Sequence, residues 1–232
     1  MTKSKSSTLR HPPSSTLHER AYAEIRRQIL NSQLLPDEPL SEYDLAVDLK
    51  MSRTPVREAL KRLGHEGLVR FVLNRGAFVS SLSVSDVAEI YQVREQLEGF
   101  AAFVAAEKMS GPEITALEQE LANAEKLAGS GRIAETFESD INLHQCLVLS
   151  TQNNRIAGIL ETLADQVHRI RVLSPNTPGR LEATLREHGE ILSCVKRRDK
   201  EAARAAMVRH LHAAQENALR LLMMPSATRR QR

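Results

Sequence analysis

Residues 51–60 read MSRTPVREAL, and this stretch predicts the helix from which the rest of the fold can be worked out. Ser52 is a favoured N-cap residue, and Pro55 falls in the first helical turn, where its missing N–H costs little. Apolar side chains then recur at helical spacing, at Val56, Ala59, Leu60 and Leu63. Gly67 is the kind of residue that ends a helix. We therefore expect an amphipathic helix here, with one buried face.

Two more helical patterns precede this one, and a hairpin pattern follows it. The first runs from about His18 and stops before Pro36, and the second begins at Ser41. After Gly67 come two β-like runs, 68–73 and 77–80, joined by the turn-forming residues Asn74-Arg75-Gly76. Three helices and a hairpin, with a short turn between the second and third helices, predict a winged helix-turn-helix over residues 17–82.

The polar face of the third helix carries a basic stripe. Arg53, Arg57 and Lys61 recur every four residues, on the side opposite the apolar residues. Arginine can donate two hydrogen bonds to O6 and N7 of guanine in the major groove, and Arg75 beside Gly76 would place a cation at the hairpin tip. Most basic stripes are only solvated surface. Here the order of the elements favours DNA binding instead.

Four segments of this region resemble the GntR family of transcription factors: residues 40–42 (LSE), 51–60, 67–69 (GLV) and 74–79 (NRGAFV). The resemblance implies a homodimer that binds a near-palindromic double-stranded DNA operator. One departure is Tyr43, which stands where relatives commonly carry arginine. From the stripe and the resemblance together, the residues expected at DNA are Arg53, Thr54, Pro55, Arg57, Lys61, Arg75 and Gly76.

The composition of the 232 residues agrees with a largely helical protein. Aromatic residues make up only 3% and there is no Trp, which favours helices packed on aliphatic stripes. No apolar run approaches a membrane span, and Cys146 and Cys194 are too few for a disulfide framework. We therefore expect a cytoplasmic protein without a membrane partner. The termini, residues 1–16 and 225–232, are expected to be a disordered basic arm and a flexible tail.

Residues 83–224 predict an all-helical second domain, so the fold class is mainly α. Long amphipathic segments follow one another without a strand pattern, at about 84–109, 112–128, 132–150, 154–173, 180–197 and 199–223. Six such segments are typical of a helical bundle.

Four polar residues stand on the apolar stripes of that domain. Asp140 and His144 lie one turn apart on the segment 132–150, and His188 and His210 are centred in the stripes of the last two segments. One inward histidine is usually a satisfied core residue, but three histidines and a buried carboxylate together favour a divalent cation. Zinc is the first expectation, with nickel, manganese, cobalt and iron as alternatives.

This pattern resembles the FCD ligand-binding domain of the FadR subgroup of GntR regulators, through residues 140–144 (DINLH), Glu187-His188 and residues 207–210 (MVRH). The resemblance implies that Asp140, His144, His188 and His210 hold a metal beside a pocket for a small organic acid. Arg94 lies on an apolar stripe and would bind the effector's carboxylate or pair with Glu98 one turn away. Asn217 would hydrogen-bond the effector or satisfy a backbone group.

These features predict a repressor whose affinity for DNA is controlled by a small carboxylate. Two alternatives remain at this point. The metal could be purely structural, or the domain could be a metal-dependent hydrolase-like enzyme. Against an enzyme, no separate general base stands out on the inward stripes, and a fused DNA-reading domain argues for sensing.

Overall fold

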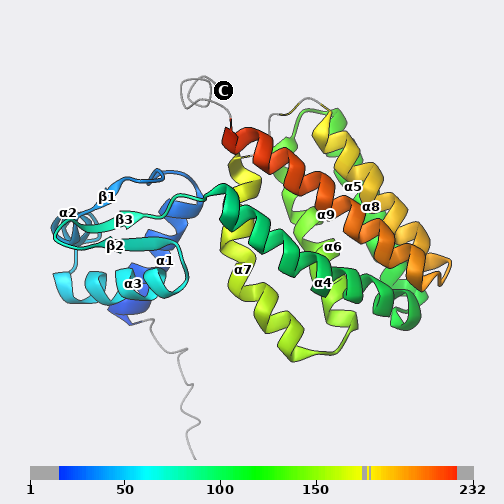
Figure 1. Ribbon diagram of the computed structural model, residues 1–232, viewed down its shortest axis with the longest axis horizontal. Coiled ribbons are helices and arrows are strands. Elements are labelled where there is room, and N and C mark those ends of the chain that lie inside the picture. Colours follow the sequence, from blue (N-terminus) through cyan, green and yellow to red (C-terminus); the bar gives the residue numbers. More distant parts are fainter. Residues whose placement is uncertain (1–15, 174–176, 178, 224–232) are drawn as a thin grey trace, which may run out of the picture. The chain divides into compact units, whose positions relative to one another are not determined.

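The computed structural model describes residues 16–173, 177 and 179–223, without the side chains of residues 134, 137, 138, 172 and 173. Two compact units form, Met1–Ser81 and Leu82–Arg232, each with its own hydrophobic core (Figure 1). The expected basic arm lies outside the described residues except for Thr16, and the expected tail, 225–232, lies wholly outside them.

The first unit contains three helices and a small antiparallel sheet. Its elements are α1 (Leu17–Leu30), β1 (Pro39–Leu40), α2 (Glu42–Asp48), α3 (Arg53–His65), β2 (Val69–Val72) and β3 (Gly76–Val79). The strand order is β1-β3-β2, and Pro39 pairs with Phe78. Strand β1 was not expected, because two residues are too short to show an alternating pattern. The three helices and the hairpin are those of the predicted winged helix-turn-helix.

Helix α3 is held by the apolar face that the sequence indicated. Val56, Ala59, Leu60 and Leu63 are all almost fully buried. Ser52 is the N-cap residue, although its side chain makes no capping hydrogen bond. At the other end, Gly67 adopts a φ of 75°, a left-handed conformation that favours glycine and stops the helix.

The hairpin turn is formed by Leu73, Asn74 and Arg75, with the Arg75 N–H donating to the Val72 carbonyl at 3.0 Å. Gly76 is the first residue of β3 instead of part of the turn, and its φ is 91°. The prediction of the hairpin is therefore right, with the turn shifted by one residue. Gly76 allows the backbone to leave the turn in a conformation that other residues adopt only with strain.

The second unit is a bundle made from α4 (Val84–Lys108), α5 (Gly111–Gly129), α6 (Thr136–Ser150), α7 (Asn154–Leu173), α8 (Arg180–Lys196) and α9 (Lys200–Met223). The segment expected as one helix over 132–150 is instead a short 3-10 turn, η1 (Ile133–Glu135), followed by α6. Helices α4 and α9 lie side by side (Figure 1). They approach closely at Gly99, where a Cβ would stand 3.1 Å from Cγ2 of Val208.

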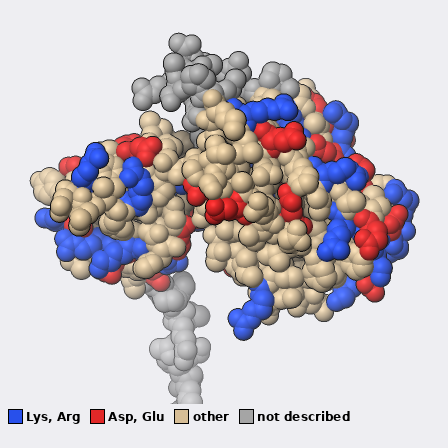
Figure 2. All heavy atoms as spheres, in the orientation of Figure 1, with Lys and Arg blue, Asp and Glu red and all other residues tan. Residues whose placement is uncertain are grey.

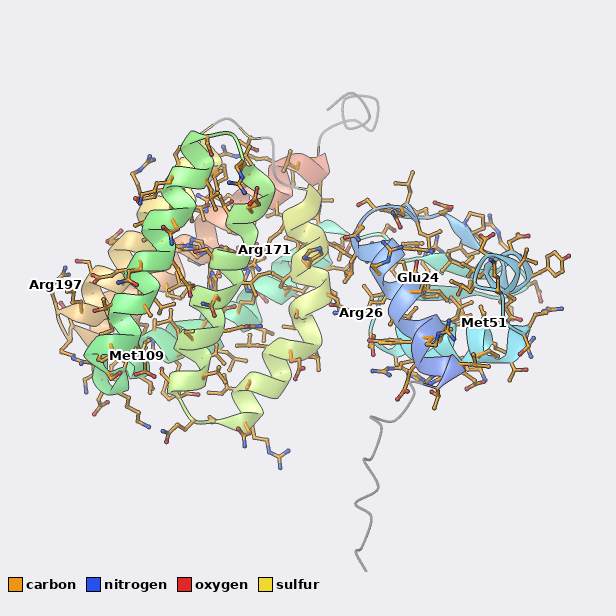
Figure 3. All side chains as sticks on the ribbon, turned by 180° about the vertical axis from the view of Figure 1, so that it is seen from behind. Glu24, Arg26, Met51, Met109, Arg171 and Arg197 are labelled. Atoms are coloured by element: carbon orange, nitrogen blue, oxygen red, sulfur yellow. The ribbon has the colours of Figure 1, made fainter. Side chains whose placement is uncertain are left out.

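The end of α4 is joined to the turn after α8 by hydrogen bonds from the Arg198 side chain to backbone carbonyls. Met109 and Arg197 mark this end of the bundle (Figure 3). The Arg198 guanidinium donates to the carbonyl of Met109 at 2.6 Å. Within the described ranges, every helix is too short or too polar to cross a lipid bilayer.

Candidate functional site

The first candidate surface is the outer face of α3. Arg53, Thr54, Arg57 and Lys61 are exposed, and Pro55 is half-buried. Figure 2 shows Lys and Arg side chains gathered over this helix. The structure therefore places the predicted basic stripe opposite the buried face of α3, where it is free to meet a ligand.

Two arginines of this stripe share one carboxylate from the neighbouring helix. Nε and Nη2 of Arg57 donate to the two oxygens of Glu42, at 2.9 and 2.8 Å. Nη2 of Arg53 lies 3.5 Å from the same carboxylate. The hydrogen bonds from Arg57 hold the pKa of Glu42 below its ordinary value. Sequence reasoning quoted Glu42 within the LSE motif but gave it no role.

The second basic position is the end of the hairpin. Arg75 and Gly76 are both exposed there. The Arg75 guanidinium lies 5.5 Å from the centre of the Phe78 ring, within the range of a cation–π contact. The hairpin thus carries an exposed cation at its tip, as the sequence predicted.

The four predicted metal ligands meet in the second unit. Asp140 and His144 come from α6, His188 from α8 and His210 from α9. One ligand atom of each lies within 4.8 Å of the others. Nε2 of His188 is 3.4 Å from Nε2 of His210 and 3.3 Å from Oδ1 of Asp140. The sequence identified each residue on its own stripe, and folding brings the stripes together.

Carboxylates orient two of these imidazoles by contacting Nδ1 of each ring. Nδ1 of His144 contacts Glu98, and Nδ1 of His210 lies 2.8 Å from Oε2 of Glu187. A carboxylate only accepts, so each Nδ1 carries the proton and each Nε2 presents a lone pair to the centre. Nε2 of His144 is buried and has no hydrogen-bond partner among the described residues. Converging lone pairs and a carboxylate fit a divalent cation, and carboxylate-held imidazoles are typical of such sites.

Burial sets the protonation of this cluster. It lowers the pKa of both His188 and His210, which keeps them neutral, the form that binds metal. Burial also opposes ionisation of Asp140, but the charge of the Arg171 guanidinium, 2.8 Å away, acts against it, and the pKa of Asp140 lies below its ordinary value. Asp140 is therefore a carboxylate, ready to act as a ligand.

A cavity of about 100 Å³ lies against the cluster. His188 and His210 form part of its wall, together with Arg94, Arg171, Arg180 and the buried Asn217. Roughly 10–15 Å³ accommodates one water-sized group, so the cavity admits about seven to ten such groups. This is the size of a small organic molecule.

The sequence left open whether Arg94 pairs with Glu98 or faces a pocket, and in the structure it does both. It is buried and forms an ion pair with Glu98, with Nε 2.5 Å from Oε1, and it also lies in the cavity wall. The other two arginines are paired in the same manner, Arg171 with Asp140 at 2.8 Å and Arg180 with Glu187 at 2.7 Å. Three arginines thus balance three carboxylates around the cavity.

Sequence reasoning missed part of this arrangement. It considered Glu98 only as a partner of Arg94, and it gave no role to Arg171 or Arg180. The sequence showed no separate general base on the inward stripes; the structure adds two carboxylates beside the cluster, Glu98 and Glu187, and each contacts an imidazole. A helical stripe at four-residue spacing, continued from Val167, would have included Arg171.

Comparison with known proteins gives the same two-part organisation. The profile described as bacterial regulatory proteins, gntR family, matches residues 17–79, and that of the FCD domain matches residues 89–213. The chain is 32% identical over 192 residues to the HTH-type transcriptional regulator YdhC of Bacillus subtilis, covering 82% of this chain and 86% of that one. It is 30% identical over 205 residues to the HTH-type transcriptional repressor RspR of Escherichia coli, covering 88% and 90%.

Among solved structures, a transcriptional regulator from Rhodococcus sp. RHA1 matches with a TM-score of 0.72. It is 24% identical, and the match covers 87% of this chain and 97% of that one. At this identity the likeness concerns the fold, which is shared over nearly the whole length of both chains.

Proposed function

The chain belongs to the GntR family of bacterial transcription regulators, with a C-terminal FCD domain, and we propose that it is a repressor controlled by a small organic acid. It is a DNA-binding regulator and not an enzyme, as the family and the regulator names of its relatives indicate. In this proposal a homodimer binds a near-palindromic operator. Arg53, Thr54, Pro55, Arg57 and Lys61 of α3 contact one major groove, and Arg75 and Gly76 reach the adjoining backbone.

The observation that carries the proposal is the convergence of four candidate metal ligands, three of which line a cavity that also has arginines in its wall. Asp140, His144, His188 and His210 would hold a divalent ion, of which zinc suits three imidazoles and a carboxylate best. Bound there, the ion would supply positive charge to a carboxylate oxygen of the effector. Arg94 and Asn217 in the cavity wall would bind and orient the rest of the acid.

The charge balance of the cavity supports an acidic effector. Arg94, Arg171 and Arg180 are paired with Glu98, Asp140 and Glu187, so these groups sum to zero while the imidazoles are neutral. A bound divalent cation would leave two positive charges in excess. Buried charge without a counter-charge is costly, and a small anion would compensate it.

Effector binding would alter DNA affinity through the dimer. Half-sites on DNA recur about one helical turn apart, roughly 34 Å, so a modest rearrangement of the ligand-binding domains would place one reading helix out of register. We expect the free protein to repress and the effector to release it.

The test is a thermal-shift screen of small organic acids and sugar acids on the zinc-loaded protein, followed by gel-shift titration with the compounds that bind. We expect the effector to raise the Tm only when metal is present and to weaken DNA binding. Tightened DNA binding would reverse the sign of regulation. Effector binding that is complete in protein shown by elemental analysis to be metal-free would refute the role of the ion.

If the metal were purely structural and took no part in sensing, a different result would be expected. His188→Ala would then abolish folding in a chelator-free buffer, whereas a sensing role predicts a folded protein that binds DNA and ignores the acid. Circular dichroism and gel shifts on the same preparation separate the two.

A further inference from the structure

We infer that Glu42 is a specificity-determining residue, which positions Arg57 for guanine and restrains both Arg57 and Arg53 from binding phosphate. The inference rests on the family's DNA-binding function and on α3 as the reading helix, and not on the metal or the effector. It is carried by the contacts of one carboxylate on α2 with two arginines on α3.

The geometry of the Arg57–Glu42 pair leaves the useful edge of the guanidinium free. Glu42 occupies Nε and Nη2 from the side, at 2.9 and 2.8 Å. Each Nη atom still has an N–H on the outer end of the fork. That outer edge is the one that can donate side by side to O6 and N7 of guanine. The carboxylate therefore fixes the plane of the guanidinium without consuming the donors that read the base.

Stability does not explain this pair. The side chains of Arg57, Arg53 and Glu42 are 53%, 60% and 27% exposed. Ion pairs with such exposed partners contribute little to folding. Glu42 also lies in the first turn of α2, where an acidic residue is favourable, but that role needs no contact with α3. What the contact does provide is a fixed orientation for two otherwise flexible side chains.

The charge of Glu42 has a second effect on DNA binding. A carboxylate beside the reading helix repels phosphates and partly neutralises the two arginines. Both effects weaken binding to DNA of any sequence. On an operator, the guanine contact compensates for this loss, whereas on other DNA nothing does. Glu42 would thus widen the difference between specific and non-specific affinity.

The experiment compares Glu42→Gln with a matched control, Glu24→Gln. Glu24 forms the same kind of two-bonded pair with Arg27, at 2.9 and 2.6 Å, but both partners of this pair belong to α1. Both changes remove one negative charge from the same unit. The probes are a duplex selected from a randomised library by the wild-type protein and a scrambled duplex of the same composition, titrated at several salt concentrations.

For Glu42→Gln we expect the ratio of specific to scrambled affinity to fall about tenfold, within the range of one bidentate base contact. The affinity for scrambled DNA should rise. If the released Arg57 binds a phosphate, the plot of log affinity for scrambled DNA against log salt concentration becomes steeper by about 0.9 for each such contact. Glu24→Gln should leave the specificity ratio within twofold of wild type.

A double-mutant cycle keeps the inference testable if Glu42→Gln also changes folding. In an Arg57→Lys background, which keeps the charge and removes the fork, Glu42→Gln should cause little further loss of guanine preference. Equal and additive losses in the two backgrounds would overturn the inference, as would an equal loss in Glu24→Gln. Selection of an operator by the wild-type protein tests DNA binding itself, so failure there is distinct from failure of the role of Glu42.

Discussion

Replacing Glu98 by glutamine tests how the candidate metal cluster is supported, because this one buried carboxylate contacts two partners. It pairs with Arg94 at 2.5 Å, with both side chains 5% exposed, and it contacts Nδ1 of His144. Burial opposes ionisation of Glu98, but Arg94 and His144 outweigh it and lower its pKa. Glutamine keeps the shape and removes the charge.

Two losses should follow, and they have separate causes. Arg94 would remain charged and buried without its counter-ion, and breaking a buried pair in this way costs about 3–5 kcal/mol of unfolding free energy. His144 would lose the carboxylate that fixes its tautomer and the orientation of its ring. Loss of such a partner typically lowers metal affinity about 10- to 100-fold.

A double variant separates these effects. In Arg94→Met with Glu98→Gln no unpaired charge remains, so most of the lost stability should return. Metal affinity should stay low, because His144 still lacks its carboxylate. Glu187→Gln is the matched control on His210. The Glu187 side chain is 25% exposed, so we expect a stability loss of no more than about 2 kcal/mol but a comparable loss of metal affinity.

Unfolding is measured by urea titration in the presence of a chelator, so that metal binding does not contribute, and zinc affinity is measured by competition with a chromogenic chelator. If Glu98→Gln unfolds within about 1 kcal/mol of wild type, the argument from buried charge is wrong. If the double variant regains wild-type zinc affinity, Glu98 does not support His144.

Three further predictions concern the ligands and the backbone. His188→Ala should reduce the zinc content of protein purified without chelator from about one equivalent to almost none, measured by elemental analysis; undiminished zinc would place the metal elsewhere. In zinc-loaded protein, succinate should bind roughly 10- to 100-fold more tightly than butyrate in calorimetric titrations, because a second carboxylate compensates the second excess charge; equal affinities would contradict the charge balance. Gly76→Ala should destabilise the protein by about 1 kcal/mol through backbone strain, whereas Gly158→Ala, at an exposed position of α7 where a Cβ meets nothing within 4 Å, should stabilise it by about 0.5–1 kcal/mol. Thermal melts that rank the two variants in the opposite order would refute this explanation.

The sequence predicted the elements of the fold because its apolar residues recur at helical spacing and because residues that favour turns separate the segments. It failed where an element is too short for a period to be seen. Strand β1 has two residues, and the 3-10 turn η1 precedes α6 without any break in the apolar pattern. Such elements are set by tertiary contacts instead of by local sequence.

The site was predicted unevenly for a related reason. Each candidate metal ligand stands on an apolar stripe, which is a local signal that a single sequence can show. Which stripes meet is not local. Glu98 on α4 and His144 on α6 are 46 residues apart, so their contact could be found only in the folded chain. The contact of Glu42 on α2 with Arg53 and Arg57 on α3 could likewise not be found from the sequence, because it joins two different helices.

The self-balanced ion pairs around the cavity have a consequence for the order in which ligands bind. Without a cation, every arginine in the wall already has its own carboxylate, so an acid gains little by entering. Without an acid, a bound cation would leave the cavity with surplus charge. We therefore expect the domain to act as a coincidence detector, in which each ligand strengthens the binding of the other and the full response requires both.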